Sequence, residues 1–129
     1  KPINYPKFYL EANSFINNLS GNIIYLPWGN YFTYSWSLNS GLDGRIGNPA
    51  NSVFQKFIIT GCDPADLCTP TLLQEEIYNC LNQENLTCLK NLNISYIIVD
   101  KSVTIPLNIS WIPSKNLVYN NNYLEIYKV

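Results

Sequence analysis

With 129 residues, a net charge of −1 and charged side chains at only 13% of positions, the chain is unlike proteins that bind nucleic acids or anionic membrane surfaces. Its length fits one domain, and a hydrophobic content of 47% is enough to bury a core. The chain has no histidine, which excludes catalytic groups that depend on an imidazole base.

Apolar residues near the start of the chain recur at helical spacing and predict a helix over residues 5–19. Pro6 falls in the first turn of this helix, and Gly21 follows its end. Residues 22–26 form a short apolar run that predicts a strand, which Pro27 stops.

Residues 27–52 carry many turn-forming residues and no clear period, so this segment is predicted to be irregular. Residues 53–60 fit either a helix or a strand. A second helical region is expected from residues 69–71 onward, where Thr71 and Gln74 have the spacing of a capping box.

The second helical region is expected to break at residues 82–85 and to continue as a shorter helix over residues 86–92. Residues 94–99 predict a strand that is buried on both faces, as in a parallel pair covered by helices. Residues 117–119 and 123–129 flank three asparagines and predict a C-terminal β-hairpin.

This order of elements predicts an α/β fold, or alternatively an α+β fold, with a small mixed sheet and helices packed on it. The two best strands are expected to pair in parallel through the second helical region. We expect residues 1–129 to form a single domain, with no linker long enough to divide it.

The four cysteines, Cys62, Cys68, Cys80 and Cys88, lie close together in the chain and lack a Cys-x-x-Cys motif. They are predicted to form two disulfides, as in proteins outside the reducing cytoplasm. If the helix breaks near residues 82–85, local pairs are expected, Cys62 with Cys68 and Cys80 with Cys88. The alternative is a loop at Cys62 and Cys68 that is stapled onto the helix, and we favour the local pairs.

Four Asn-x-Ser/Thr acceptor sites also favour an extracytoplasmic location, because glycosylation takes place outside the cytoplasm. The acceptor residues are Asn18, Asn85, Asn93 and Asn108. Asn18 and Asn85 lie near predicted helix ends and are the best candidates. Asn93 directly precedes a buried strand and is expected to be less accessible.

Three segments together resemble a known kind of domain. They are residues 12–29 (ANSFINNLSGNIIYLPWG), 89–99 (LKNLNISYIIV) and 122–128 (NYLEIYK). This pattern resembles the soluble C-terminal domain of polytopic GT-C-type glycosyltransferases, including YfhO-like proteins, in which membrane helices precede a domain outside the membrane. The resemblance implies an upstream membrane domain as partner, and no catalytic residue in this part. Residues 61–88 have no counterpart in it.

The chain shows no signal peptide and no run of about twenty apolar residues, so we expect a fragment of a larger membrane protein. The small number of groups that titrate between neutral and acidic pH suits an acidic exterior, such as that of an acidophilic archaeon.

The acidic pairs of the chain are better explained by structure than by catalysis. Glu75 and Glu76 are adjacent on a predicted helix and point apart. Asp63 and Asp66 fit the cap and first turn of a short helix. We therefore expect no enzymatic activity from this domain alone, no cofactor and no metal ion.

Aromatic residues crowd the segment after the first predicted strand, where α/β domains place their ligand sites. Together with polar residues that follow, they form a candidate sugar-binding loop. Its candidate residues are Trp28, Tyr31, Tyr34, Trp36, Asp43, Arg45 and Asn48. The alternatives are that the aromatics fill the core or pack on the membrane domain, or that they contact another surface protein. For Trp28 we expect a core position.

Two functional hypotheses follow. The first is a non-catalytic extracytoplasmic domain of a glycosyltransferase-like membrane protein, which packs on its own membrane part and contacts glycan or lipid-linked sugar. The second is a self-contained secreted or surface-layer glycoprotein that serves as an interaction domain. Neither hypothesis involves nucleic acid.

Overall fold

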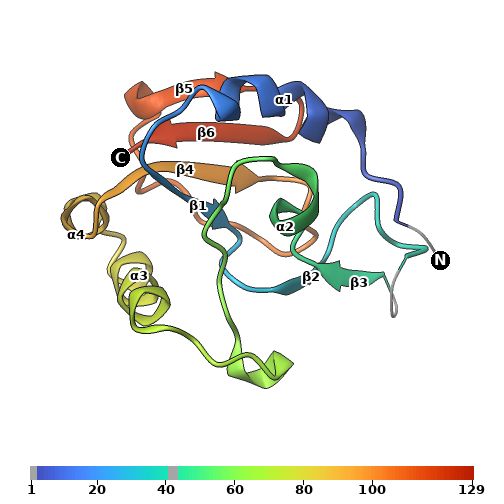
Figure 1. The fold of residues 1–129 in the computed structure, drawn as a ribbon, viewed down its shortest axis with the longest axis horizontal. Helices are drawn as coiled ribbons and strands as arrows, with labels where there is room; N and C mark the ends of the chain where they lie inside the picture. The colour runs from blue at the N-terminus through green and yellow to red at the C-terminus, as the bar shows by residue number, and fades with distance from the viewer. Residues whose placement is uncertain (1–2, 41–43) are drawn as a thin grey trace.

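The computed structural model describes residues 3–40 and 44–129, which form a four-stranded sheet, a two-stranded sheet and flanking helices (Figure 1). The strands of the larger sheet, in spatial order, are β1 (Asn22–Leu26), β4 (Ile94–Asp100), β6 (Leu124–Lys128) and β5 (Leu117–Asn120). β1 and β4 are parallel, whereas β6 is antiparallel to both β4 and β5. The predicted mixed sheet, the parallel pair and the C-terminal hairpin are thus confirmed.

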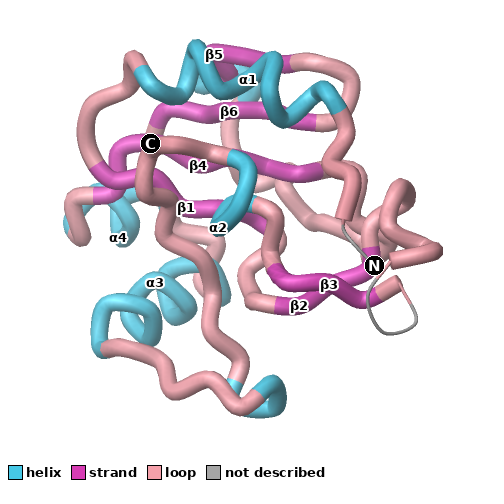
Figure 2. The backbone as a smooth tube through the Cα atoms, turned by 45° about the vertical axis from the view of Figure 1, so that its right-hand side comes forward, coloured by secondary structure: helices cyan, strands magenta, loops and turns pink. Residues whose placement is uncertain are grey.

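Helices cover both faces of this sheet, and the α/β prediction is confirmed. The α-helices are α1 (Lys7–Asn17), α2 (Ala50–Val53), α3 (Leu72–Asn82) and α4 (Leu86–Asn91). α1 lies along β5 and β6, whereas α3 and α4 lie beyond β1 and β4 (Figures 1 and 2). Of the described residues, none belong to a helix long and apolar enough to cross a membrane.

Alternating side chains divide the interior into a cluster on each face of the sheet. Ile23 and Tyr25 of β1 pack with α1, whereas Ile24 and Leu26 pack with α3 and α4. Because successive side chains of a strand point to opposite faces, an unbroken apolar run such as β1 serves both clusters.

The long segment that was predicted to be irregular contains three short elements. These are β2 (Tyr31–Thr33), β3 (Arg45–Gly47) and α2, and β2 pairs with β3 in an antiparallel ribbon. The prediction was wrong because a strand of three residues is too short to show a period.

The ambiguous segment over residues 53–60 runs beside the outer edge of β1. The backbone N–H of Ile59 donates to the carbonyl of Ile23 at 2.8 Å, and the N–H of Tyr25 donates to the carbonyl of Ile59 at 3.1 Å. This edge of the sheet is therefore covered by the chain itself.

Both disulfides are local, as favoured. Cys62 pairs with Cys68 and Cys80 with Cys88, with Cα–Cα distances of 5.5 and 5.4 Å. The second pair forms because the helix breaks after α3, so that α4 folds back beside it. Two disulfides are typical of proteins outside the reducing cytoplasm.

Side-chain caps start both of these helices. Thr71 accepts from the backbone N–H of Gln74, and the Gln74 side chain accepts from the N–H of Thr71, which confirms the predicted capping box. Asn85 caps α4 by accepting from the N–H of Cys88 at 3.1 Å.

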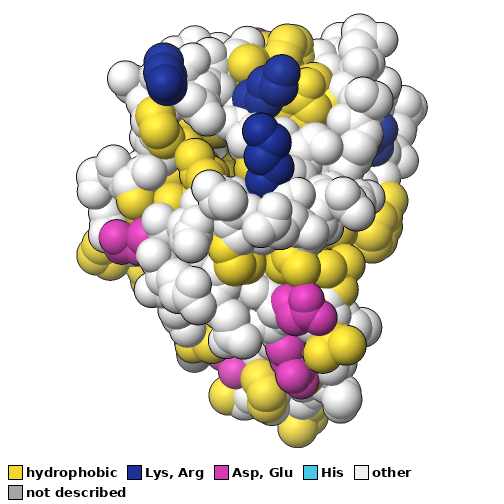
Figure 3. Space-filling model, turned by 90° about the vertical axis from the view of Figure 1, so that its left-hand side faces the viewer, with side chains coloured by type: hydrophobic (Ala, Val, Ile, Leu, Met, Phe, Trp, Pro, Cys, Tyr) yellow, Lys and Arg dark blue, Asp and Glu magenta, His cyan; other side chains and the backbone are white. Residues whose placement is uncertain are grey.

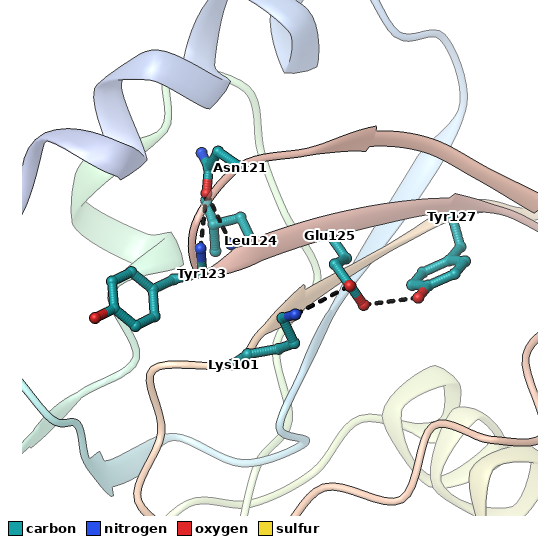
Figure 4. A network of polar contacts seen from close by, with 6 residues as sticks. All are labelled: Lys101, Asn121, Tyr123, Leu124, Glu125 and Tyr127. Carbon is teal, nitrogen blue, oxygen red and sulfur yellow. Dashed lines mark hydrogen bonds and ion pairs between the residues drawn. The ribbon is translucent and has the colours of Figure 1, made fainter. Parts of the chain in front are cut away.

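The hairpin between β5 and β6 is closed by Asn121. Its side-chain oxygen accepts from the backbone N–H groups of Tyr123 and Leu124 at 3.0 and 2.9 Å (Figure 4). The pairing of β5 with β6 shifts register between Leu117 and Tyr119. Asparagine suits this turn because its short side chain can replace backbone hydrogen bonds.

A small polar network lies on β6 beside this hairpin. Glu125 accepts from Lys101 at 3.0 Å and from the Tyr127 hydroxyl at 2.7 Å (Figure 4). Burial alone would raise the pKa of Glu125, but these two hydrogen bonds and the Lys101 charge lower it on balance.

Candidate functional site

Trp28, two residues past the end of β1, lines three adjoining clefts of about 300, 330 and 230 Å³. It is half-buried and packs against the cluster under α3 and α4. The expected core position is therefore half right, because part of the ring is buried and part faces the clefts. Within the described residues, the indole N–H of Trp28 has no hydrogen-bond partner, unlike those of Trp36 and Trp111.

The first cleft is enclosed by aromatic rings, prolines and acidic side chains. It is lined by Trp28, Gly29, Cys62, Asp63, Pro64, Pro70, Gln74, Glu75 and Tyr78. Its residues come from the end of β1, from the disulfide-closed loop and from the outer face of α3. The disulfide between Cys62 and Cys68 thus holds one wall of the cleft.

Three local features fix the walls of this cleft. Gly61 packs so closely on the backbone of Gly29 that a Cβ atom at this position would collide with it, and only glycine allows this approach. Gln74 donates to the carbonyl of Thr60 at 2.9 Å and so joins α3 to the loop. Asp63 accepts from the N–H of Ala65 and caps η1 (Pro64–Asp66), as predicted.

The second cleft contains Tyr31, Arg45 and Asp66. The Arg45 guanidinium forms an ion pair with Asp66 at 2.6 Å and lies 5.8 Å from the centre of the Tyr31 ring. The positive charge of Arg45 is therefore already engaged by a carboxylate and an aromatic face.

Of the seven candidate binding residues, the structure brings Trp28, Tyr31 and Arg45 to these clefts. Tyr34 and Trp36 instead lie inward, where their rings stack with centroids 5.5 Å apart. Their place under the β2–β3 ribbon fits the alternative that aromatics of this loop fill the core.

Asn48 is buried, donating to the carbonyl of Gly29 at 3.1 Å and accepting from the N–H of Ala50 at 3.0 Å. It shapes the loop and does not face a cleft. Asp43 lies outside the described residues.

The predicted site lacked Asp63, Glu75 and Tyr78, which face the first cleft. From the sequence, Asp63 was expected to cap a short helix and Glu75 to lie on a helix, and neither was expected at a ligand site. Their position beside Trp28 depends on how the disulfide loop and α3 pack, and no short sequence motif carries that information.

A buried carboxylate that the sequence did not reveal lies at the end of β4. Asp100 is fully buried and accepts from the hydroxyls of Tyr9 and Tyr25, both at 2.6 Å. Ser102 donates to its other oxygen through its N–H at 3.0 Å and its hydroxyl at 2.6 Å. Tyr9 and Tyr25 lie 91 and 75 residues away in sequence, which explains why no local pattern showed the contact.

This network holds the fold together. Burial and the nearby Asp100 charge raise the pKa of the Tyr9 and Tyr25 hydroxyls above the usual value of 10.0. Trp36 adds a hydrogen bond to the Ser102 hydroxyl at 3.1 Å. Because Asp100 is sealed from solvent, it cannot meet a substrate, and we assign it a structural role.

All four acceptor asparagines are exposed. Asn93 is exposed although it directly precedes a buried strand, because a left-handed turn with φ of 63° places this residue outside that strand. Asn108 donates to Glu84 at 2.9 Å and so lies next to the Asn85 site. Gly21, just after the Asn18 site, packs directly on Ser95 of the Asn93 site.

No protein-family model, curated protein or solved structure matches this chain. In residues 3–40 and 44–129 no three His, Cys, Asp or Glu side chains gather in a way that could hold a metal ion. What the Trp28 clefts offer is aromatic surface beside carboxylates, which is suited to binding.

Proposed function

We propose that this chain is a non-catalytic extracytoplasmic domain that contacts a glycan through the clefts around Trp28. The observation that carries the proposal is the first cleft, in which the rings of Trp28 and Tyr78 stand beside the carboxylates of Asp63 and Glu75. The C–H faces of a sugar ring stack on aromatic rings, and its hydroxyls donate to carboxylates. A cleft of about 300 Å³ is at the small end of ligand sites and suits one or two sugar residues.

We place this domain in a glycosyltransferase-like membrane protein, with the upstream membrane domain as its partner and glycan or lipid-linked sugar as its ligand. The support is the resemblance carried by residues 12–29, 89–99 and 122–128, together with the two disulfides. Glycosyl transfer itself would belong to the membrane part.

The secreted or surface-layer interaction domain is the second candidate, and exposed apolar side chains favour it. Leu67 is 98% exposed at the end of the disulfide-closed loop, and Phe57 and Leu72 are 82% and 72% exposed. Figure 3 shows hydrophobic and acidic side chains together in the lower part of the molecule, where α3 and η1 lie. Such a surface is also suited to contact with protein.

A glycan array followed by calorimetry on purified protein tests the first proposal. Trp28→Ala and Tyr78→Ala should each abolish glycan binding, because each removes one aromatic wall. Tyr123→Ala is the matched control, since Tyr123 is a similarly exposed tyrosine on the hairpin and is not a lining residue of the cleft. Melting curves must show that all three variants remain folded.

The proposal fails if the wild-type protein binds no glycan, or if Tyr123→Ala weakens binding as much as Tyr78→Ala does. Turnover of a sugar donor by this domain alone would contradict its non-catalytic role. The full-length gene separates the two candidates, because about ten upstream membrane spans would support the first and a lone signal peptide the second.

A further inference from the structure

The first cleft carries negative charge without a compensating cation. Asp63 and Glu75 line it, and no Lys or Arg is among its lining residues. The adjoining second cleft is lined by one cationic residue, Arg45, which is paired with Asp66 at 2.6 Å. An incoming ligand therefore meets two carboxylates and no free positive charge in this part of the structure.

The part of the chain that surrounds the cleft also carries negative charge. Residues 57–89 contain five acidic side chains and not one Lys or Arg. The acidic residues are Asp63, Asp66, Glu75, Glu76 and Glu84. Figure 3 shows the separation, with acidic side chains below and Lys or Arg side chains above. Charges of one sign around a cleft raise the local concentration of ligands of opposite sign.

The aromatic walls favour the same ligands. The faces of Trp and Tyr rings carry negative charge density and attract cations within about 6 Å of the ring centre. Trp28 and Tyr78 are thus suited both to the C–H face of a sugar and to an ammonium group attached to it.

We infer that the Trp28 cleft selects a cationic sugar, a hexosamine with a free amine, over neutral and anionic sugars. This inference rests on the proposed glycan-binding function and adds the class of ligand. The ring stacks on the aromatic walls while the ammonium group lies beside Asp63 and Glu75. Uronic acids and sugar phosphates are repelled, so a lipid-linked sugar would bind with its phosphate directed out of the cleft.

Calorimetric titration with three tetrasaccharides tests the inference. The ligands are β-1,4-linked glucosamine, β-1,4-linked N-acetylglucosamine and galacturonic acid, at a pH where amines are protonated and carboxylates ionised. The glucosamine tetramer should bind about tenfold more tightly than the N-acetylated one, and the galacturonic acid tetramer should not bind. The difference should shrink as salt is added.

Variants separate the cleft from the general charge of the molecule. Asp63→Asn and Glu75→Gln should each reduce the preference for the amine several-fold, and Asp63→Asn keeps the oxygen that caps η1. Glu76→Gln is the matched control, because it removes the same charge from the same helix but lies outside the cleft lining. It should leave the preference unchanged.

Equal binding of the glucosamine and N-acetylglucosamine tetramers would overturn the inference and leave the glycan-binding function standing. If the protein binds none of the three tetrasaccharides and no other glycan, the glycan-binding function is overturned as well. Equal loss of preference in Glu76→Gln and Glu75→Gln would also overturn the inference, since the amine would then respond only to overall charge. A lysine tetrapeptide serves as a further ligand, and binding of the peptide without binding of the amino sugar contradicts the inference.

Discussion

Asp100 joins three parts of the chain at one buried carboxylate. Its partners are Tyr9 on α1, Tyr25 on β1 and Ser102 in the loop after β4. A carboxylate is the one common side chain that offers only acceptors to four donors. Burying a carboxylate costs free energy, and here the four hydrogen bonds from its donors offset that cost.

Asp100→Asn should therefore destabilise the protein by about 3 kcal/mol, because the amide turns an NH₂ group toward hydroxyl donors. Urea unfolding measures the loss. Glu125→Gln provides the comparison, since Glu125 also accepts two hydrogen bonds but is only partly buried. Its cost should stay below about 1 kcal/mol. A loss of similar size in both variants would contradict the role given to Asp100.

Leu67 has a backbone conformation that leucine rarely adopts. Its φ of 62° and ψ of 29° lie in the left-handed region, and its side chain is 98% exposed. This conformation costs an ordinary residue roughly 1–2 kcal/mol, whereas asparagine tolerates it. Leu67→Asn should raise the free energy of unfolding by about 0.5–1 kcal/mol in chemical denaturation.

Leu72→Asn is the control for this substitution. Leu72 is also exposed but is the first residue of α3, with an ordinary helical backbone. Leu72→Asn should not raise the free energy of unfolding, because asparagine has a lower helix propensity than leucine. A loss of stability in Leu67→Asn would mean that the exposed leucine contributes more to the fold than its contacts indicate.

At the residue scale, sequence reasoning succeeded where a signal lies within a few positions. The capping pair Thr71 and Gln74 was predicted because its spacing is itself the motif. For Trp28 a core position was expected from its place directly after a strand, and the ring is in fact only half-buried. For Tyr34 and Trp36 the sequence left a sugar site and the core as alternatives, because the direction of these side chains depends on Val103 and Ser102, which lie far along the chain.

Among the elements, the two disulfides act on different parts of the molecule. Cys80–Cys88 links α3 to α4, and Cys80 is buried in the core. Cys62–Cys68 closes a loop that carries Asp63 and Pro64 into the first cleft. The Cys80–Cys88 disulfide is thus part of the core, and the Cys62–Cys68 disulfide is part of the candidate site.

Replacing Cys80 and Cys88 by alanine should lower the free energy of unfolding by about 2–3 kcal/mol through loss of the loop constraint, with glycan affinity retained. Replacing Cys62 and Cys68 by serine should weaken glycan binding, because one wall of the cleft is released. Urea unfolding and calorimetry on both double variants measure the two effects. Unchanged glycan affinity in the Cys62/Cys68 variant would contradict the place of this loop in the site.

The predicted elements were those with enough residues to show a pattern. Seven residues in β4 and eleven in α3 gave clear strand and helix signals. β2 and β3 have three residues each and are specified by pairing with one another. The first cleft was not predictable because it forms between a loop, a helix and a strand end.

For the whole molecule, the buried tyrosines set an upper limit on pH. Burial and Asp100 raise the pKa of Tyr9 and Tyr25 above 10.0, and burial with the Glu125 hydrogen bond raises that of Tyr127 to about 12. Above about pH 10 the unfolded chain loses these protons while the folded protein retains them. The unfolded state is then favoured, so stability must fall as pH rises.

Urea unfolding between about pH 8 and pH 11 should show a stability that is flat at first and falls beyond about pH 10. Tyrosine absorbance should show that Tyr9 and Tyr25 ionise only on unfolding. In Tyr127→Phe the loss of stability with rising pH should be shallower, because one tyrosine with a raised pKa has been removed. A stability that stays constant up to pH 11 would show that these hydroxyls are not held neutral by the fold.

The four acceptor asparagines predict that the native protein is glycosylated. Asn18, Asn85, Asn93 and Asn108 are all exposed, so mass spectrometry of protein from its native source should find a glycan on at least one. Four unmodified asparagines in native material would remove this support for an extracytoplasmic location. Protein made in a bacterial host is not a suitable sample.

The shift in register within β5 affects whether the exposed edge of the sheet can pair with strands of neighbouring molecules at high protein concentration. The segment around Ile59 covers the β1 edge, and among the described residues β5 has no strand on its outer side. An unpaired edge can recruit strands from neighbouring molecules and start fibres. In β5 the edge is only four residues long and its spacing is interrupted between Leu117 and Tyr119, so an incoming strand would find few groups in register. Dense packing of many copies should therefore leave the protein free of amyloid-like growth along this edge.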